Sequence, residues 1–88
     1  MIVNLRKDKY DIYIGRGSIW GNPYIIGRDG SRSQVIEKYR HYILNNQTLL
    51  DNLSTLKNKV LGCYCKPEAC HGDILLELLY LKEKYDEI

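Results

Sequence analysis

The sequence has no phenylalanine, and tryptophan and methionine each occur once among its 88 residues. It has no run of about 20 apolar residues, which excludes a transmembrane helix, and its first residues, MIVNLRKDKY, lack the apolar segment of a signal peptide. Proline occurs only at Pro23 and Pro67, and no repeat or low-complexity stretch divides the chain. We therefore expect one domain, residues 1–88, in a cytoplasmic protein that does not contact membranes.

Charge is nearly balanced, since the net charge is +2 at pH 7, and this is too small to predict strong binding to nucleic acid. Its distribution is uneven: residues 1–66 carry eleven Lys or Arg and five Asp or Glu, whereas residues 67–88 carry two and six. The first three quarters of the chain would therefore attract an anion. The three cysteines are an odd number, which argues against a disulfide framework and leaves free thiols or metal ligands.

Hydrophobic patterns predict the order of the secondary structure. Residues 2–5 and 10–14 have the pattern of two short neighbouring strands joined by a tight connection, and residues 60–65 that of a third strand. Ser31 and Gln34 have capping-box spacing, which predicts a helix to about Leu44, and leucines at 49, 53 and 56 predict a second, shorter helix. The expected fold is α/β, a small single domain with a short three-stranded sheet, at least partly parallel, and about three helices. The middle helices would cross over between parallel strands two and three.

The last helix is predicted from Gly72 and Asp73 to about Tyr85, and its first two turns are apolar on nearly every face. A surface helix of a small monomer would not show this pattern, because one face should be polar. A chain of this length also buries only about 60 to 65% of its unfolded surface, so its own core gives thin stability. We therefore expect a homo-oligomer that forms through the last helix.

Five glycines and one proline lie between Gly15 and Gly30, which predicts a long, organised loop with a binding role. Ligands of open α/β sheets bind beyond the carboxyl ends of the strands, where this loop and the loop from Lys66 to Asp73 both emerge. Arg16 offers a guanidinium for phosphate or carboxylate, and Trp20 offers a flat face for a base. Alternatively, Trp20 caps the core and the glycines only form turns.

The segment CYCKPEACHGD, residues 63–73, contains every cysteine of the chain and His71. A strand places Cys63 and Cys65 on one face, and Cys70 and His71 follow at the start of the last helix, so four soft ligands could converge on a metal. The spacing is nonetheless not a usual zinc pattern, and adjacent Cys70 and His71 point apart in most backbones. We therefore predict no stoichiometric zinc, with a zinc-stapled interaction module as the alternative.

The start of the last helix also favours negative charge, because free backbone N–H groups and the helix dipole meet there, and Lys66 would add a cation. The same environment would lower the pKa of Cys70. An enzyme acting on a nucleotide or nucleoside, with Cys70 as nucleophile and His71 or Asp73 in acid–base work, is therefore another alternative. In a purely structural role, Asp73 would be the N-cap of the last helix.

The sequence resembles a phage and bacterial family named domain of unknown function 4326, in the segments YDIYIGRGSIWGNPY, GRDGSRSQVIEKYRHYI and LGCYCKPEACHGDIL. The resemblance covers nearly the whole chain. The family's I-G-R, W-G-N-P, G-x-D-G-x-R and C-x-C-x-P-x-x-C-H-G-D features are all present, at Arg16, Trp20, Asn22, Pro23, Arg32, Cys63, Cys65, Pro67, Cys70, His71, Gly72 and Asp73. The family name implies no activity. A viral source suggests, by analogy alone, a phage counter-defence protein that sequesters a nucleotide-derived signal in the host cytoplasm.

These observations favour binding of a phosphate-bearing, nucleotide-like small molecule between the two loops, without a cofactor or a metal. In this hypothesis Trp20 stacks on a base or ribose, Arg16 and Arg32 hold phosphate, and Asn22 or Asp73 bonds a hydroxyl. The predicted ligand-binding residues are Arg16, Gly17, Ser18, Trp20, Asn22, Arg32, Lys66, Cys70, His71, Gly72 and Asp73.

Overall fold

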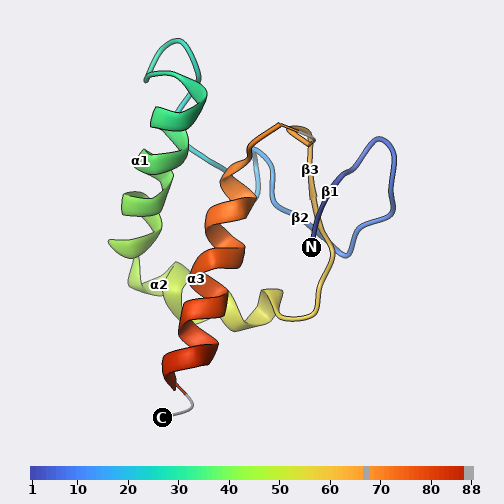
Figure 1. Ribbon diagram of the computed structural model, residues 1–88, viewed down its shortest axis with the longest axis vertical. Helices are drawn as coiled ribbons and strands as arrows, with labels where there is room; N and C mark the ends of the chain where they lie inside the picture. The colour runs from blue at the N-terminus through green and yellow to red at the C-terminus, as the bar shows by residue number, and fades with distance from the viewer. Residues whose placement is uncertain (67, 87–88) are drawn as a thin grey trace.

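The computed structural model describes residues 1–66 and 68–86, and these form a three-stranded parallel sheet with helices gathered along one side of it (Figure 1). This confirms the predicted α/β class, the parallel pairing and the number of α-helices. In chain order the elements are the strands β1 (Ile2–Asn4) and β2 (Ile12–Tyr13), the helices α1 (Arg32–Leu44) and α2 (Gln47–Asn52), the 3₁₀ helix η1 (Leu53–Leu56), the strand β3 (Leu61–Cys63) and the helix α3 (His71–Asp86).

The order of the strands in the sheet is β1-β3-β2, so the prediction that the first two strands are neighbours is wrong. The last strand lies between the first two, and every residue of β3 is buried, whereas β1 and β2 are half-buried edge strands. Gly62 lies in the middle of β3, where a Cβ atom would be 2.6 Å from the ring of Tyr10. The absence of a side chain therefore lets the connection between the edge strands pass over the central strand.

The crossover from β2 to β3 runs through α1, α2 and η1, as predicted. The capping box of α1 is confirmed, because the Gln34 backbone N–H donates to the Ser31 hydroxyl and the Ser31 N–H donates to the Gln34 side chain. Helix α1 buries Val35, Tyr39 and Ile43. The leucine pattern after Asn46 forms α2 and then a turn of 3₁₀ helix, so the second predicted helix changes its winding near Leu53.

Helix α3 begins at His71 and packs against α1 and η1. The sequence predicts that not all of its apolar side chains can be buried by one chain. Leu76 is indeed only half-buried and Tyr80 and Leu81 are exposed, whereas Ile74, Leu75, Leu78 and Leu79 are all buried. These four belong to one core cluster with residues of the sheet, such as Leu61, and of the crossover helices, such as Ile43 and Leu53. A homo-oligomer through this helix stays a prediction. No helix among the described residues is long and apolar enough to cross a membrane.

Candidate functional site

A pocket of about 220 Å³ opens at the carboxyl ends of β2 and β3, between the loop that follows β2 and the loop that precedes α3. This is the edge of the sheet at which the sequence placed a ligand site. Of the predicted site residues, the pocket brings together Arg16, Asn22, Arg32, Cys70 and His71. The remaining ones, Gly17, Ser18, Trp20, Lys66, Gly72 and Asp73, do not line it.

Trp20 is the clearest departure from the predicted site. Its side chain is 4% exposed and belongs to the hydrophobic core. The Tyr39 hydroxyl, from α1, donates to the Trp20 carbonyl at 2.6 Å and fixes the loop at this position. Trp20 therefore packs into the core, as in the alternative interpretation in which it does not contact a ligand. Its ring has no free face on which a base could stack.

The loop after β2 satisfies most of its polar groups internally. The Ser18 hydroxyl donates to the Gly15 carbonyl at 2.7 Å. The Asn22 side chain accepts from the Tyr24 N–H and donates to the Val35 carbonyl in α1. Asn22 therefore shapes the pocket wall, and both ends of its amide are already used.

Two guanidinium groups at the pocket have no carboxylate partner. The Arg16 side chain is exposed and makes no hydrogen bond or ion pair with the described part of the chain, whereas the Arg32 guanidinium donates to the Ala69 carbonyl at 2.9 Å and interacts with the Cys65 thiol. None of the described residues that line the pocket is acidic. Because other surface arginines of this chain, such as Arg28 and Arg40, are paired with carboxylates, the pocket combines cations that are available to an external anion.

The start of α3 differs from the anion site predicted there, because its polar groups already have partners. The Gly72 N–H donates to the Cys70 sulfur at 3.4 Å, and the Asp73 N–H donates to the Cys70 carbonyl at 3.0 Å. Lys66 forms an ion pair with Asp73 at 2.7 Å. Asp73 is the third residue of the helix rather than its N-cap, and its carboxylate accepts from the Cys70 N–H at 3.1 Å.

Asp73 is held in its charged form by these contacts. Burial alone would raise the pKa of Asp73, but the hydrogen bonds from Lys66 and from the Cys70 N–H lower it below its usual value. Asp73 is thus a structural acid that closes the first turn of α3. It does not line the pocket.

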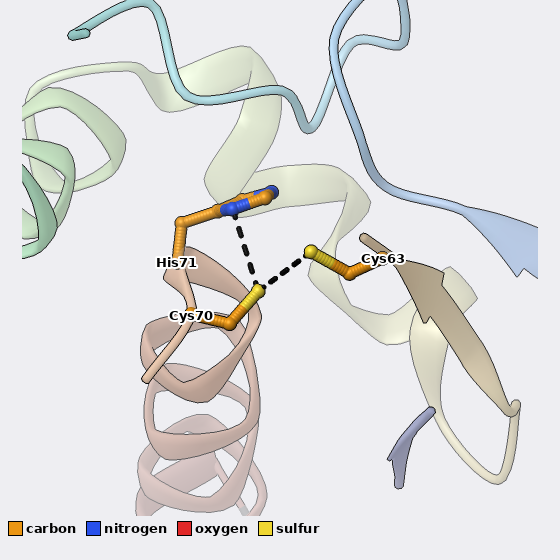
Figure 2. A group of neighbouring side chains, drawn as sticks. All are labelled: Cys63, Cys70 and His71. Atoms are coloured by element: carbon orange, nitrogen blue, oxygen red, sulfur yellow. Dashed lines mark hydrogen bonds between the residues drawn. The ribbon is translucent and has the colours of Figure 1, made fainter. Parts of the chain in front are cut away.

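The pocket floor is formed by Cys63 from β3 and by Cys70 and His71 from the start of α3, all of them buried (Figure 2). The two sulfur atoms lie 2.8 Å apart, and the Cys70 sulfur lies 3.6 Å from Nδ1 of His71. The expectation that Cys70 and His71 point apart is wrong. The helix begins at His71, and at this junction the two neighbouring side chains turn toward the same point.

The thiols of Cys63 and Cys70 at the pocket floor have pKa values shifted in opposite directions. The hydrogen bond from the Cys70 thiol lowers the pKa of Cys63 to about 5, against the opposing effect of burial. The same hydrogen bond, together with burial, raises the pKa of Cys70. The low pKa expected for Cys70 from its place at a helix start is therefore not found, because the neighbouring Cys63 carries the negative charge instead.

His71 has one defined tautomer when it is neutral. Its Nε2 lies 2.7 Å from the Ile14 carbonyl, and a carbonyl only accepts, so Nε2 carries the proton and Nδ1 presents a lone pair toward Cys70. The ring of Tyr39 packs edge-on against the imidazole at 5.0 Å. The imidazole is therefore fixed on both sides and can act as a ligand or acceptor through Nδ1 only.

The residues that form the pocket walls were not predicted from the sequence. These are chiefly aromatic and aliphatic, and they include Tyr13, Tyr24, Tyr64, Ile26, Val35 and Ile36. Tyr13 and Tyr64 make an edge-to-face ring contact at 6.4 Å. Their signal was present in the sequence, because Tyr13 ends β2 and Tyr64 directly follows β3, the two strands at whose carboxyl ends the ligand was expected.

The fold and the site define a small parallel α/β protein with a half-open pocket at the carboxyl edge of its sheet, walled by tyrosines and bordered by two arginines. The model of the family described as domain of unknown function (DUF4326) matches residues 3–81. The chain belongs to this family.

Two viral proteins are similar to the chain. An uncharacterized 12.4 kDa protein from the nrdA-td intergenic region of Enterobacteria phage T4 is 37% identical over 83 residues, which cover 89% of this chain and 75% of the phage protein. An uncharacterized protein of Acanthamoeba polyphaga mimivirus is 34% identical over 110 aligned positions, which cover 98% of this chain and 84% of the viral protein. No solved structure matches the chain.

Proposed function

We propose that this protein binds a small phosphate-bearing, nucleotide-like molecule in the pocket at the carboxyl edge of its sheet and releases it unchanged. The observation that carries the proposal is the pair of guanidinium groups, Arg16 and Arg32, which border the pocket and have no carboxylate partner among the described residues. Guanidinium groups bind phosphate through paired, charge-assisted hydrogen bonds. None of the described lining residues carries a carboxylate that would compete with a phosphate for these guanidinium groups.

The rest of the pocket suits the non-phosphate part of such a molecule. The rings of Tyr13, Tyr24 and Tyr64 line it, and they replace Trp20 as the surfaces on which a base or ribose would rest. Its volume of about 220 Å³ is below the roughly 300–1,000 Å³ of pockets that enclose drug-sized ligands. We therefore expect one ring system to enter while the phosphate stays at the arginines near the opening.

The biological setting of this proposal is a virus-encoded protein that acts in the host cytoplasm and sequesters a nucleotide-derived signal. The two viral relatives support the viral part. A binding role without turnover fits the site as well, because the Nε2 atom of His71 is tied to a backbone carbonyl and Asp73 lies outside the pocket.

Titration calorimetry with ribonucleoside 5′-monophosphates, each compared with its nucleoside and with inorganic phosphate, tests the proposal. Arg16→Ala should weaken binding of the best monophosphate by about 1.5–3 kcal/mol, or roughly 10- to 150-fold, through loss of a charge-assisted pair. Lys9→Ala removes an equal charge from the exposed connection between β1 and β2, outside the pocket lining, and should leave binding unchanged.

The ligand is then recovered after heating, and its mass is measured. Intact ligand supports binding without turnover, whereas a cleaved or modified ligand would replace this proposal by the enzymatic alternative. Equal affinity of the wild type and Arg16→Ala for every phosphate-bearing probe would remove the observation on which the proposal rests.

A further inference from the structure

We propose that Cys63, Cys65, Cys70 and His71 together hold one zinc ion at the pocket floor. The donor atoms of Cys63, Cys70 and His71 all lie within 4.8 Å of one another, and the three residues are buried. This inference goes beyond the proposed function, because a phosphate held by Arg16 and Arg32 does not require a metal. It also reverses the prediction of no zinc, which rested on Cys70 and His71 pointing apart. In the structure these two side chains converge.

The spacing of the donor atoms is close to that of a tetrahedral site. With Zn–S bonds of about 2.3 Å and Zn–N bonds of about 2.0 Å, neighbouring donor atoms in a tetrahedron lie about 3.3–3.8 Å apart. The Cys70 sulfur and Nδ1 of His71 are separated by 3.6 Å, which is within this range. The two sulfur atoms are 2.8 Å apart, so they would separate by about 1 Å when an ion enters between them.

The surroundings of these donors are those that metal ligands need. A metal-binding histidine usually donates its second ring N–H to a carbonyl or carboxylate, which orients the ring and fixes its tautomer. Here Nε2 donates to the Ile14 carbonyl at 2.7 Å, while Nδ1 faces the sulfur atoms. Backbone N–H groups of Cys65 and Gly72 donate to the sulfurs of Cys63 and Cys70, and such bonds stabilise thiolates.

Cys65 is the fourth ligand in this proposal. It follows Cys63 by two positions, lines the same pocket and is half-buried, and its thiol interacts with the thiols of both Cys63 and Cys70. Its sulfur is not among the three donor atoms that lie within 4.8 Å of one another, so the Cys65 side chain must move toward them when the ion binds. Four protein ligands make a closed site, which is typical of structural rather than catalytic zinc.

The donor set also selects the metal and suggests what the metal does. Three thiolates and one imidazole are soft ligands that favour Zn²⁺ over hard cations such as Mg²⁺ or Ca²⁺. The ion would join the end of β3 to the start of α3, which are otherwise linked by a short loop. A chain of 88 residues has a small core, and a structural metal is a common supplement at this size.

The ion would also affect where an anion binds. Three thiolates and Zn²⁺ carry a net charge of −1 at the pocket floor, so a phosphate would be repelled from the floor and held at the arginines. The zinc proposal and the ligand proposal are therefore compatible. They also fail separately: Arg16→Ala should leave the zinc content unchanged, and loss of the metal is measured without any nucleotide.

The test is metal analysis of the full chain, purified under reducing conditions with zinc and then dialysed. We expect about one zinc per chain that resists mild chelation. Replacement by Co²⁺ should give the visible absorption of a tetrahedral site together with thiolate-to-cobalt charge transfer. Removal of the metal with a strong chelator should lower the Tm by more than about 10 °C, because metal binding contributes to folding.

Variants identify the ligands. Cys65→Ser should reduce the thiolate-to-cobalt absorption by about one third and weaken zinc binding by at least about 100-fold, because even the loss of an outer partner costs about 10- to 100-fold. His71→Asn should lose the metal, whereas the matched control His41→Asn, at an exposed histidine of α1, should keep it. Cys65 is half-buried, so its variant remains informative even if His71→Asn fails to fold.

Three results would overturn the proposal. One is wild-type protein, reduced and supplied with zinc or cobalt, that binds neither. A second is a mass lower by two hydrogens with no metal bound, which would show that two of the three cysteines form a disulfide instead. A cobalt spectrum that Cys65→Ser does not change would exclude Cys65 and overturn the four-ligand site as stated.

Discussion

The loop after β2 and the loop before α3 line the same pocket, yet they leave different groups available. In the first loop, Ser18 and Asn22 bond to nearby backbone, and the cation of Arg16 has no partner among the described residues. In the second, the cation of Lys66 is paired with Asp73, and the sulfur and imidazole donors converge at the pocket floor. Residue type alone therefore does not identify a binding group. A group can bind a ligand only if the local fold has not already used it.

Substitution of Trp20 should have the largest effect on stability in either loop, because Trp20 belongs to the core and not to the ligand surface. Trp20→Ala should lower the free energy of unfolding by about 3–5 kcal/mol, through lost burial and the cavity that it leaves. Denaturant unfolding measures this value. Tyr64→Ala, which removes a 54% exposed ring at the pocket, should cost less than about 1 kcal/mol.

The opposite result would restore the stacking role predicted from the sequence. If Trp20→Ala unfolds like the wild type but loses affinity for a nucleoside monophosphate, the indole contacts the ligand in solution and the assignment of Trp20 to the core is wrong.

Asp73 should give an intermediate effect, because it closes the first turn of α3 from within the second loop. Asp73→Ala removes the acceptor of the Cys70 N–H and the partner of Lys66, and should cost about 1–2 kcal/mol of unfolding free energy. Asp73→Asn keeps an oxygen acceptor for the N–H and should cost about half as much or less. If both variants lose the same stability, the ion pair with Lys66 and not the hydrogen bond to the helix start stabilises this loop.

Most of the fold followed from the sequence because its signals are local. The capping box of Ser31 and Gln34 and the apolar spacing of Val35, Tyr39 and Ile43 depend on neighbours within one or two turns. The strand order did not follow, because insertion of β3 between β1 and β2 depends on contacts between distant segments, such as the room that Gly62 leaves for Tyr10. Such long-range competition between strands has no signature in any one segment.

The candidate site was predicted only in part, for a related reason. Arg16, Arg32 and His71 were placed at the pocket because loops at the carboxyl ends of parallel strands converge there. The burial of Trp20 and the pairing of Lys66 depend on contacts made after folding, with Tyr39 and with Asp73. Convergence of Cys70 and His71 depended on the residue at which α3 begins, and helix ends are difficult to place from sequence.

Asp29 offers the smallest and most specific test of the first loop, because its carboxylate accepts hydrogen bonds from Arg28 and from the Ile25 N–H. These contacts, with that of Arg28 the larger, lower the pKa of Asp29 below its ordinary value of 3.8. The stabilisation is therefore present above the ordinary pKa and is lost as the pH falls through the lower pKa of the folded state.

The urea midpoint of the wild type should exceed that of Asp29→Asn at about pH 5, and this difference should shrink toward zero near about pH 2. Asp8→Asn, whose carboxylate makes no hydrogen bond with the described residues, is the control and should show no such convergence. A difference between wild type and Asp29→Asn that stays constant over this range would mean that the hydrogen bonds of this turn do not depend on the charge of Asp29.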